Sequence, residues 1–238
     1  MKHYEVLYQE LTNGESLAYR KAGDHGPTLL LVHGNMSSSI FFEETIAELE
    51  NDYQVVAVDL RGFGDSSYHQ EIDSLKDFAE DLALFVDALK LQDFTVLGWS
   101  TGGGVALELA VIKPEQVKKV ILLDSVGVKG YPMFQKDAAG KPLLDKPHVS
   151  KETIGQDAVQ VAPVLYAYAN QDKATMKAIW NALIYNLKQP SEDVYDEYIQ
   201  AMFKQRNLVD VDYALMVFNM SNEHSGFAEG SNRLKDIK

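Results

Sequence analysis

A serine flanked by glycines, placed directly between a strand pattern and a helix pattern, constrains the fold of this 238-residue chain more than any other feature. Residues 94–99 (FTVLGW) form the apolar run of a buried strand, Gly98, Ser100 and Gly102 follow the pattern Gly-x-Ser-x-Gly, and residues 105–112 have helical spacing. Glycine has no Cβ, so strand and helix can approach closely and the serine can adopt a strained backbone. The pattern predicts a hydroxyl held at the carboxyl end of a sheet; the alternative is a structural turn with an unreactive serine.

The first half of the chain alternates between strand and helix patterns. Asn13 and Gly14 form a strong hairpin turn signal between two short strand patterns. After this hairpin, apolar strand runs alternate with helical patterns, which predicts an α/β fold with a mostly parallel sheet covered by helices. The predicted strands are 4–10, 16–21, 28–33, 53–59, 94–99 and 119–124, and the predicted helices before the serine are 41–49 and 74–89.

The second half has a different character. Residues 126–150 are rich in glycine, proline and lysine, and helical patterns with many aromatic residues extend from 154 to 218. We therefore expect an α/β core at 1–125 with six strands, a helical cap at 126–230 inserted after the sixth strand, and the start of a return to the core at 231–238. A cap in this place would lie above Ser100. Its aromatic residues would either line a pocket or pack the cap onto the sheet.

Composition narrows the expected partners and location. Acidic residues outnumber basic ones 35 to 22, giving a net charge of −13, and such a surface repels nucleic acid and anionic membranes. The chain contains no cysteine, so it has no thiolate nucleophile and no disulfide. Its first residues lack the apolar core of a signal peptide, which predicts a cytoplasmic protein. No metal and no organic cofactor are expected.

A nucleophilic serine needs donors for the oxyanion that develops on the attacked carbonyl. The backbone N–H of Thr101 opens the helix after the serine, where partial positive charge gathers. The backbone N–H of Asn35, in the turn after the third strand, is the predicted second donor. Met36 and Trp99 lie beside this predicted site and suggest a restricted apolar pocket, although both could be packing residues. We expect His33, in the same turn, to be structural.

Three segments together resemble the α/β-hydrolase superfamily: residues 29–34 (LLLVHG), 59–66 (DLRGFGDS) and 98–103 (GWSTGG). Within it, the chain resembles small serine hydrolases such as esterases, lactonases, C–C bond hydrolases and cofactor-free haloperoxidases or perhydrolases. The resemblance implies that Ser100 attacks a small ester-like substrate and forms an acyl-enzyme that water releases. A serine at this position differs from haloalkane dehalogenases and epoxide hydrolases, which place a carboxylate there. The resemblance assigns a structural role to residues 59–66.

The chain departs from the family pattern after the sixth strand, since the family carries its acid after a seventh strand and its histidine after an eighth. One explanation is that two C-terminal strands are missing, which predicts an open sheet edge and either self-association or a need for the missing segment. A second is a triad within the chain formed by Ser100, Asp124 and His224, which satisfies the family's order. A third is a non-catalytic protein that binds a ligand or partner on the same scaffold.

Overall fold

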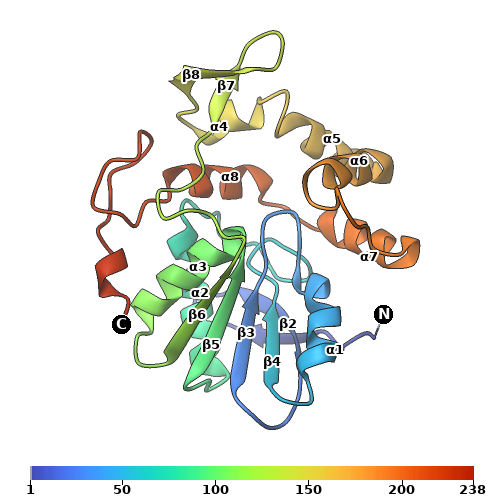
Figure 1. Cartoon of the computed structure of the whole chain (residues 1–238), viewed down its shortest axis with the longest axis vertical. Coiled ribbons are helices and arrows are strands. Elements are labelled where there is room, and N and C mark those ends of the chain that lie inside the picture. The colour runs from blue at the N-terminus through green and yellow to red at the C-terminus, as the bar shows by residue number, and fades with distance from the viewer. Residues whose placement is uncertain (1) are drawn as a thin grey trace.

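The computed structural model describes residues 2–238 and contains a six-stranded sheet with helices on both faces (Figure 1). Its strands are β1 (Leu7–Glu10), β2 (Ser16–Ala22), β3 (Thr28–Val32), β4 (Gln54–Val58), β5 (Phe94–Trp99) and β6 (Val117–Leu123). They follow the order β1-β2-β4-β3-β5-β6, in which pairs involving β1 or β2 are antiparallel and all others are parallel. The predicted α/β class with a mostly parallel sheet is confirmed.

Alternate residues of the central strands point to opposite faces of the sheet, as the period of a strand requires. Leu30 and Val32 of β3 belong to the core beneath the two longer helices, whereas Leu29 and Leu31 belong to the core beneath the short one. Burial on both faces explains why this strand is a continuous apolar run. The helices of this layer are α1 (Glu43–Leu49), α2 (Leu75–Ala88) and α3 (Thr101–Ile112).

Local signals determine where these helices begin. The Asp77 carboxylate accepts the backbone N–H of Ser74 at 2.9 Å, so the predicted capping pair does start α2. The helix predicted at 41–49 is two elements, a 3-10 turn η1 (Ser39–Phe42) followed by α1.

A second layer, which we call the upper layer, lies above the carboxyl ends of the parallel strands (Figure 1). It contains a hairpin and five helices: β7 (Phe134–Lys136), β8 (Pro142–Pro147), α4 (Lys151–Gly155), α5 (Ala162–Asn170), α6 (Lys173–Leu183), α7 (Glu192–Met202) and α8 (Leu208–Val217). The hairpin was not predicted, because its strands are short and largely exposed, one of them begins and ends with proline, and both lack the alternation of a half-buried strand. Beyond α8 the chain passes η2 (Leu234–Asp236) and returns to α3, where Arg233 pairs with Glu108 at 2.9 Å. The predicted domain boundaries themselves stay predictions.

The aromatic residues of the upper layer mainly pack its own core. Trp180 and Tyr198 are buried, and both contact Phe41 of η1, with the Tyr198 ring stacked on it at 4.1 Å between centroids. This aromatic contact connects the upper layer to the sheet layer.

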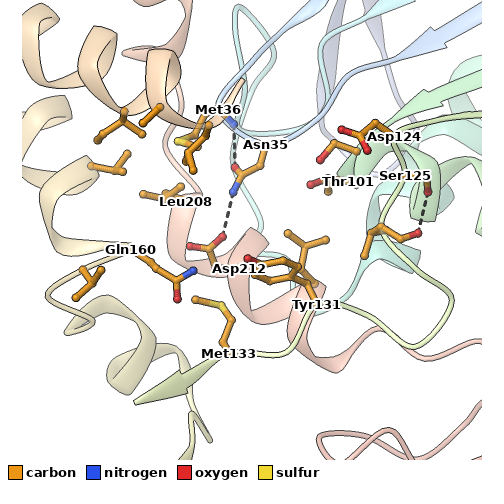
Figure 2. Close-up of a pocket in the computed structure, with 18 residues that line it drawn as sticks. Asn35, Met36, Thr101, Asp124, Ser125, Tyr131, Met133, Gln160, Leu208 and Asp212 are labelled. Carbon is orange, nitrogen blue, oxygen red and sulfur yellow. Dashed lines mark hydrogen bonds between the residues drawn. The ribbon is translucent and has the colours of Figure 1, made fainter. Parts of the chain in front are cut away.

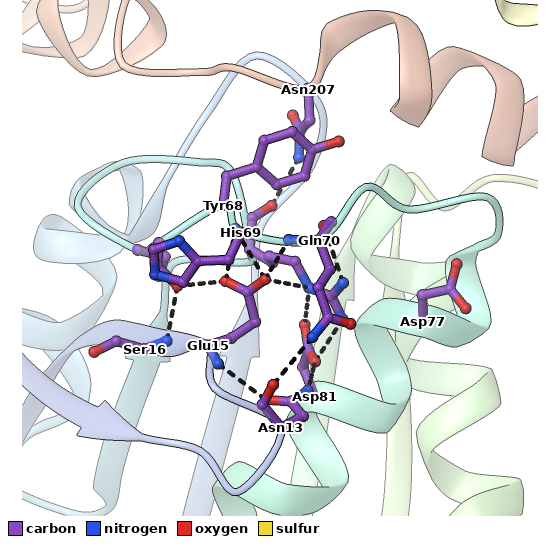
Figure 3. A network of polar contacts seen from close by, with 12 residues as sticks. Asn13, Glu15, Ser16, Tyr68, His69, Gln70, Asp77, Asp81 and Asn207 are labelled. Carbon is purple, nitrogen blue, oxygen red and sulfur yellow. Dashed lines mark hydrogen bonds and ion pairs between the residues drawn. The ribbon is translucent and has the colours of Figure 1, made fainter.

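The loop at residues 59–66 is held by a buried polar network (Figure 3). Arg61 makes two hydrogen bonds of 2.6 Å with the carboxylate of Asp81 on α2, and Asn13 of the first hairpin donates to the same carboxylate at 2.7 Å. Glu15, which is fully buried, accepts the backbone N–H groups of His69 and Gln70. These contacts join the hairpin, the loop and α2, in agreement with a structural role for the loop.

One edge of the sheet is apolar and open. Among the described residues, β6 pairs only with β5, and its residues Ile121, Leu122 and Leu123 are 45%, 47% and 49% exposed. An open edge with exposed apolar residues is the surface predicted for a sheet that lacks covering strands.

Within the described residues, 2–238, no helix combines the length and apolar character needed to cross a bilayer.

Gly14 provides a test of the first hairpin turn. Its φ of +90° is one that side chains rarely adopt, and a Cβ there would meet no atom within 4 Å. We expect Gly14→Ala to lower the free energy of unfolding by about 1–2 kcal/mol, through backbone strain alone. Gly127→Ala is the matched control, because that position is also open but lacks a positive φ. Urea unfolding would contradict this explanation if both variants had the same stability.

Candidate functional site

Ser100 lies on the sharp turn between β5 and α3. Its backbone has φ +53° and ψ −118°, a conformation that costs free energy for a residue with a side chain. A Cβ on Gly98 would lie 2.2 Å from the carbonyl oxygen of Gly102, and one on Gly102 would lie 2.3 Å from that of Val32. The two glycines are therefore required by close backbone approach on both sides of the serine, as the sequence predicted.

A cavity of about 630 Å³ opens between the carboxyl ends of the strands and the upper layer. Of the residues singled out by the sequence, five line it: Asn35, Met36, Ser100, Thr101 and Asp124. Figure 2 shows Asn35 between Met36 and Asp212, with Thr101, Asp124 and Ser125 together on another part of the wall. The structure thus brings the predicted nucleophile and both predicted oxyanion donors to one cavity.

The turn after β3 lies directly against the serine. A Cβ on Gly34 would be 2.9 Å from Ser100 Cβ, so glycine is needed for this approach. The N–H of Met36 donates to the side chains of Gln205 and Asn35, at 3.1 and 3.0 Å, whereas the N–H of Asn35 has no acceptor among the described residues. The N–H of Thr101 belongs to the first turn of α3, where amides have no intrahelical acceptor. Both N–H groups are available to a bound oxyanion, and their role as donors stays a prediction.

Trp99 does not line the cavity. Its indole packs against Phe41 and Trp180, at 6.1 and 6.3 Å between ring centroids. Met36 does line the cavity, so only one of the two predicted pocket residues lies on its wall.

None of the histidines lines the cavity among the described residues. His33 is fully buried and structural: its Nδ1 donates to the carbonyl of Gly34 at 2.7 Å and its Nε2 accepts the N–H of Leu60 at 3.0 Å. Burial lowers the pKa of His33, which keeps the ring neutral. His148 is buried in the upper layer against Asp157 at 3.1 Å. His224 is exposed in a loop, accepts the N–H of Gly226 and is not part of the cavity wall, so the structure does not join it to Ser100 and Asp124.

Sequence reasoning missed an aspartate on the cavity wall. Asp212, on α8, accepts a hydrogen bond from Asn35 Nδ2 at 3.0 Å. Burial raises the pKa of Asp212 to about 7, the charge of Asp157 adds to this effect, and the bond from Asn35 opposes it. A signal was present, because Asp212 follows Leu208 by four residues and precedes Leu215 by three, which places a carboxylate on the apolar stripe of a helix.

Gln205 connects the upper layer to the turn that carries the predicted oxyanion donor. Its Nε2 donates to Asn35 Oδ1 at 2.8 Å, and its Oε1 accepts the N–H of Met36 and the hydroxyl of Tyr168. With Asp212, this glutamine holds the side chain of Asn35 from two sides. The position of Asn35 therefore depends on contacts with residues about 170 positions away in the sequence.

Comparison with known proteins agrees with the fold. The chain is 34% identical over 123 residues to an uncharacterized protein of Mycobacterium tuberculosis and 34% identical over 105 residues to a serine hydrolase-like protein of Danio rerio. These matches cover 52% and 43% of this chain but only 36% and 32% of the relatives, so the chain spans about a third of the length of these curated relatives.

A solved esterase from Exiguobacterium antarcticum superposes with a TM-score of 0.66 at 19% identity, covering 90% of this chain and 75% of the esterase, which shows the shared fold. Residues 27–206 match the model of the alpha/beta hydrolase fold. This chain therefore belongs to the α/β-hydrolase family.

Proposed function

We propose that this chain is a serine hydrolase that cleaves a carboxylic ester or a similar small carbonyl compound. Ser100 Oγ attacks the carbonyl, and the N–H groups of Asn35 and Thr101 hold the oxyanion. The bond from the carbonyl carbon to the ester oxygen then breaks, the alcohol leaves with a proton, and water hydrolyses the acyl-enzyme to release the acid and regenerate Ser100. The observation that carries the proposal is the strained turn of Ser100, which lies on the wall of a cavity also lined by Asn35 and Thr101.

Physical chemistry supports the assignment of donors. An N–H group at a helix N-terminus carries partial positive charge, and each donor aimed at an oxyanion typically contributes roughly 3–4 kcal/mol to transition-state stabilisation. A proton acceptor for Ser100 is left unassigned, because no histidine lies on the cavity wall among the described residues.

That absence favours a second candidate function, a non-catalytic protein that binds a ligand or partner. In such a protein the cavity would be kept while Ser100 would be unreactive. The two functions differ in whether Ser100 reacts with an electrophile.

A fluorophosphonate probe separates them, because it labels activated serines. We expect labelling of the chain at one site, its loss in Ser100→Ala, and its retention in Ser125→Ala, a matched control in which another serine of the same cavity wall is removed. Intact mass spectrometry reports the adduct. Labelling that persists in Ser100→Ala would refute the nucleophile, and an unlabelled wild-type chain would favour the binding function.

A further inference from the structure

The charged residues on the cavity wall are all acidic. Asp124 and Asp212 are its acidic residues, and none of the lining residues described is lysine, arginine or histidine. An anionic group that entered would lose hydration without gaining a counter-charge, which is unfavourable in a partly buried site. The charges on this wall are therefore unfavourable to an anionic group.

Asp212 is the carboxylate set among apolar residues of this wall. Met133, Val164 and Leu208 line the same cavity, and Figure 2 shows Asp212 next to Asn35, which lies in the turn after β3. Oδ1 of Asp212 accepts the bond from Asn35, while Oδ2 has no donor among the described residues. One acceptor atom of the carboxylate is thus left for a ligand.

The partner that suits this atom is a nitrogen that carries a proton and a positive charge. Charge-assisted hydrogen bonds between an ammonium group and a carboxylate are roughly twice as strong as neutral ones. The surrounding apolar wall would hold the hydrocarbon part of the same ligand. Asn35 links the two ends of the site, because its backbone flanks Ser100 and its side chain contacts Asp212.

We propose that Asp212 is a specificity-determining residue that binds a positively charged nitrogen, so that the cavity takes amine-bearing carbonyl compounds and rejects carboxylate-bearing ones. That these compounds are substrates and not merely ligands rests on the proposed function. The charge preference does not rest on it, because the preference requires only that a ligand occupy the cavity.

Three ligands with the same eight-carbon chain test the preference: octylammonium, octanol and octanoate. They would be titrated into the purified chain at pH 8 and physiological ionic strength by calorimetry, below their micelle concentrations. We expect octylammonium to bind at least tenfold more tightly than octanol, and octanoate to bind more weakly than octanol. Asp212→Asn should reduce the preference for octylammonium over octanol to about one while leaving the affinity for octanol unchanged.

Asp145→Asn is the matched control for the strongly acidic surface. It removes the same charge from an exposed residue of the β7–β8 hairpin that does not line the cavity, so the preference should be retained. Asp212→Ser provides a second variant should Asp212→Asn fail to fold. The proposal is overturned if the preference survives in the Asp212 variants, if octanoate binds as tightly as octylammonium, or if none of the three ligands binds.

The variant Ser100→Ala keeps this test independent of the proposed function. It should retain the charge preference, since it leaves Asp212 intact. A normal preference in a chain that no fluorophosphonate labels would refute only the hydrolase, and efficient labelling without a charge preference would refute only the role of Asp212.

Discussion

Asp81→Ala is expected to lower the free energy of unfolding by about 3–5 kcal/mol, because it removes the hydrogen-bonded carboxylate from a buried guanidinium and leaves it only the more distant carboxylate of Glu15, at 3.9 Å. Arg61 and Asp81 are 5% and 1% exposed and share two hydrogen bonds of 2.6 Å. Asn13 also donates to Asp81, so the substitution releases the first hairpin as well as the loop at residues 59–66.

Glu80→Ala, on the same helix, is the matched control. Glu80 pairs with Lys76 at 2.5 Å, but both side chains are about half exposed, and exposed pairs of this kind contribute roughly 0.3–0.5 kcal/mol. Urea unfolding monitored by circular dichroism would measure both changes. Equal destabilisation by the two variants would show that the Arg61 network does not hold the loop.

The stability contributed by Asp212 is expected to fall as pH rises. Its pKa is about 7 in the folded chain against an ordinary value of 3.8, so between these values the folded state holds a proton that the unfolded state has lost. The contribution is fully present below about pH 4, declines through the window, and is absent above about pH 7. At about 1.4 kcal/mol per pKa unit, the loss is on the order of 4 kcal/mol.

Comparing the wild type with Asp212→Asn isolates this contribution, because the other titrating groups cancel in the difference. Urea unfolding at several pH values from about 4 to about 8 should show the wild type losing stability relative to the variant through the window and no further change above it. A difference that stays constant with pH would mean that the carboxyl of Asp212 titrates normally.

The parts of the fold that could be predicted from sequence are those determined by local chemistry. The turn around Ser100 needs glycines within two residues of it, and the start of α2 needs only Ser74 and Asp77, so short motifs suffice. The parallel part of the sheet could be predicted because its buried strands are continuous apolar runs in the sequence. The β7–β8 hairpin has short and largely exposed strands, which carry no such signal.

The parts of the site that could not be predicted depend on tertiary contacts. Asp212 and Gln205 reach Asn35 from about 170 residues away, and no local pattern encodes that meeting. His224 satisfies the family's order along the chain, yet its loop leaves it exposed and away from Ser100. Order along the chain constrains a triad without bringing its members together.

The open edge of the sheet also has a consequence for the serine. The N–H of Ser100 donates to the carbonyl of Leu123 at 3.0 Å, and the carbonyl of Ser100 accepts the N–H of Val126 at 3.1 Å. The backbone of the nucleophile is thus anchored to the end of β6, the strand with no outer neighbour among the described residues. Edge strands fray at lower free energy than central ones. The rates of amide hydrogen exchange at Ser100 and Val126 should therefore follow the fraying of this edge. A molecule that covers β6 would lower these rates and hold the backbone of Ser100 in place.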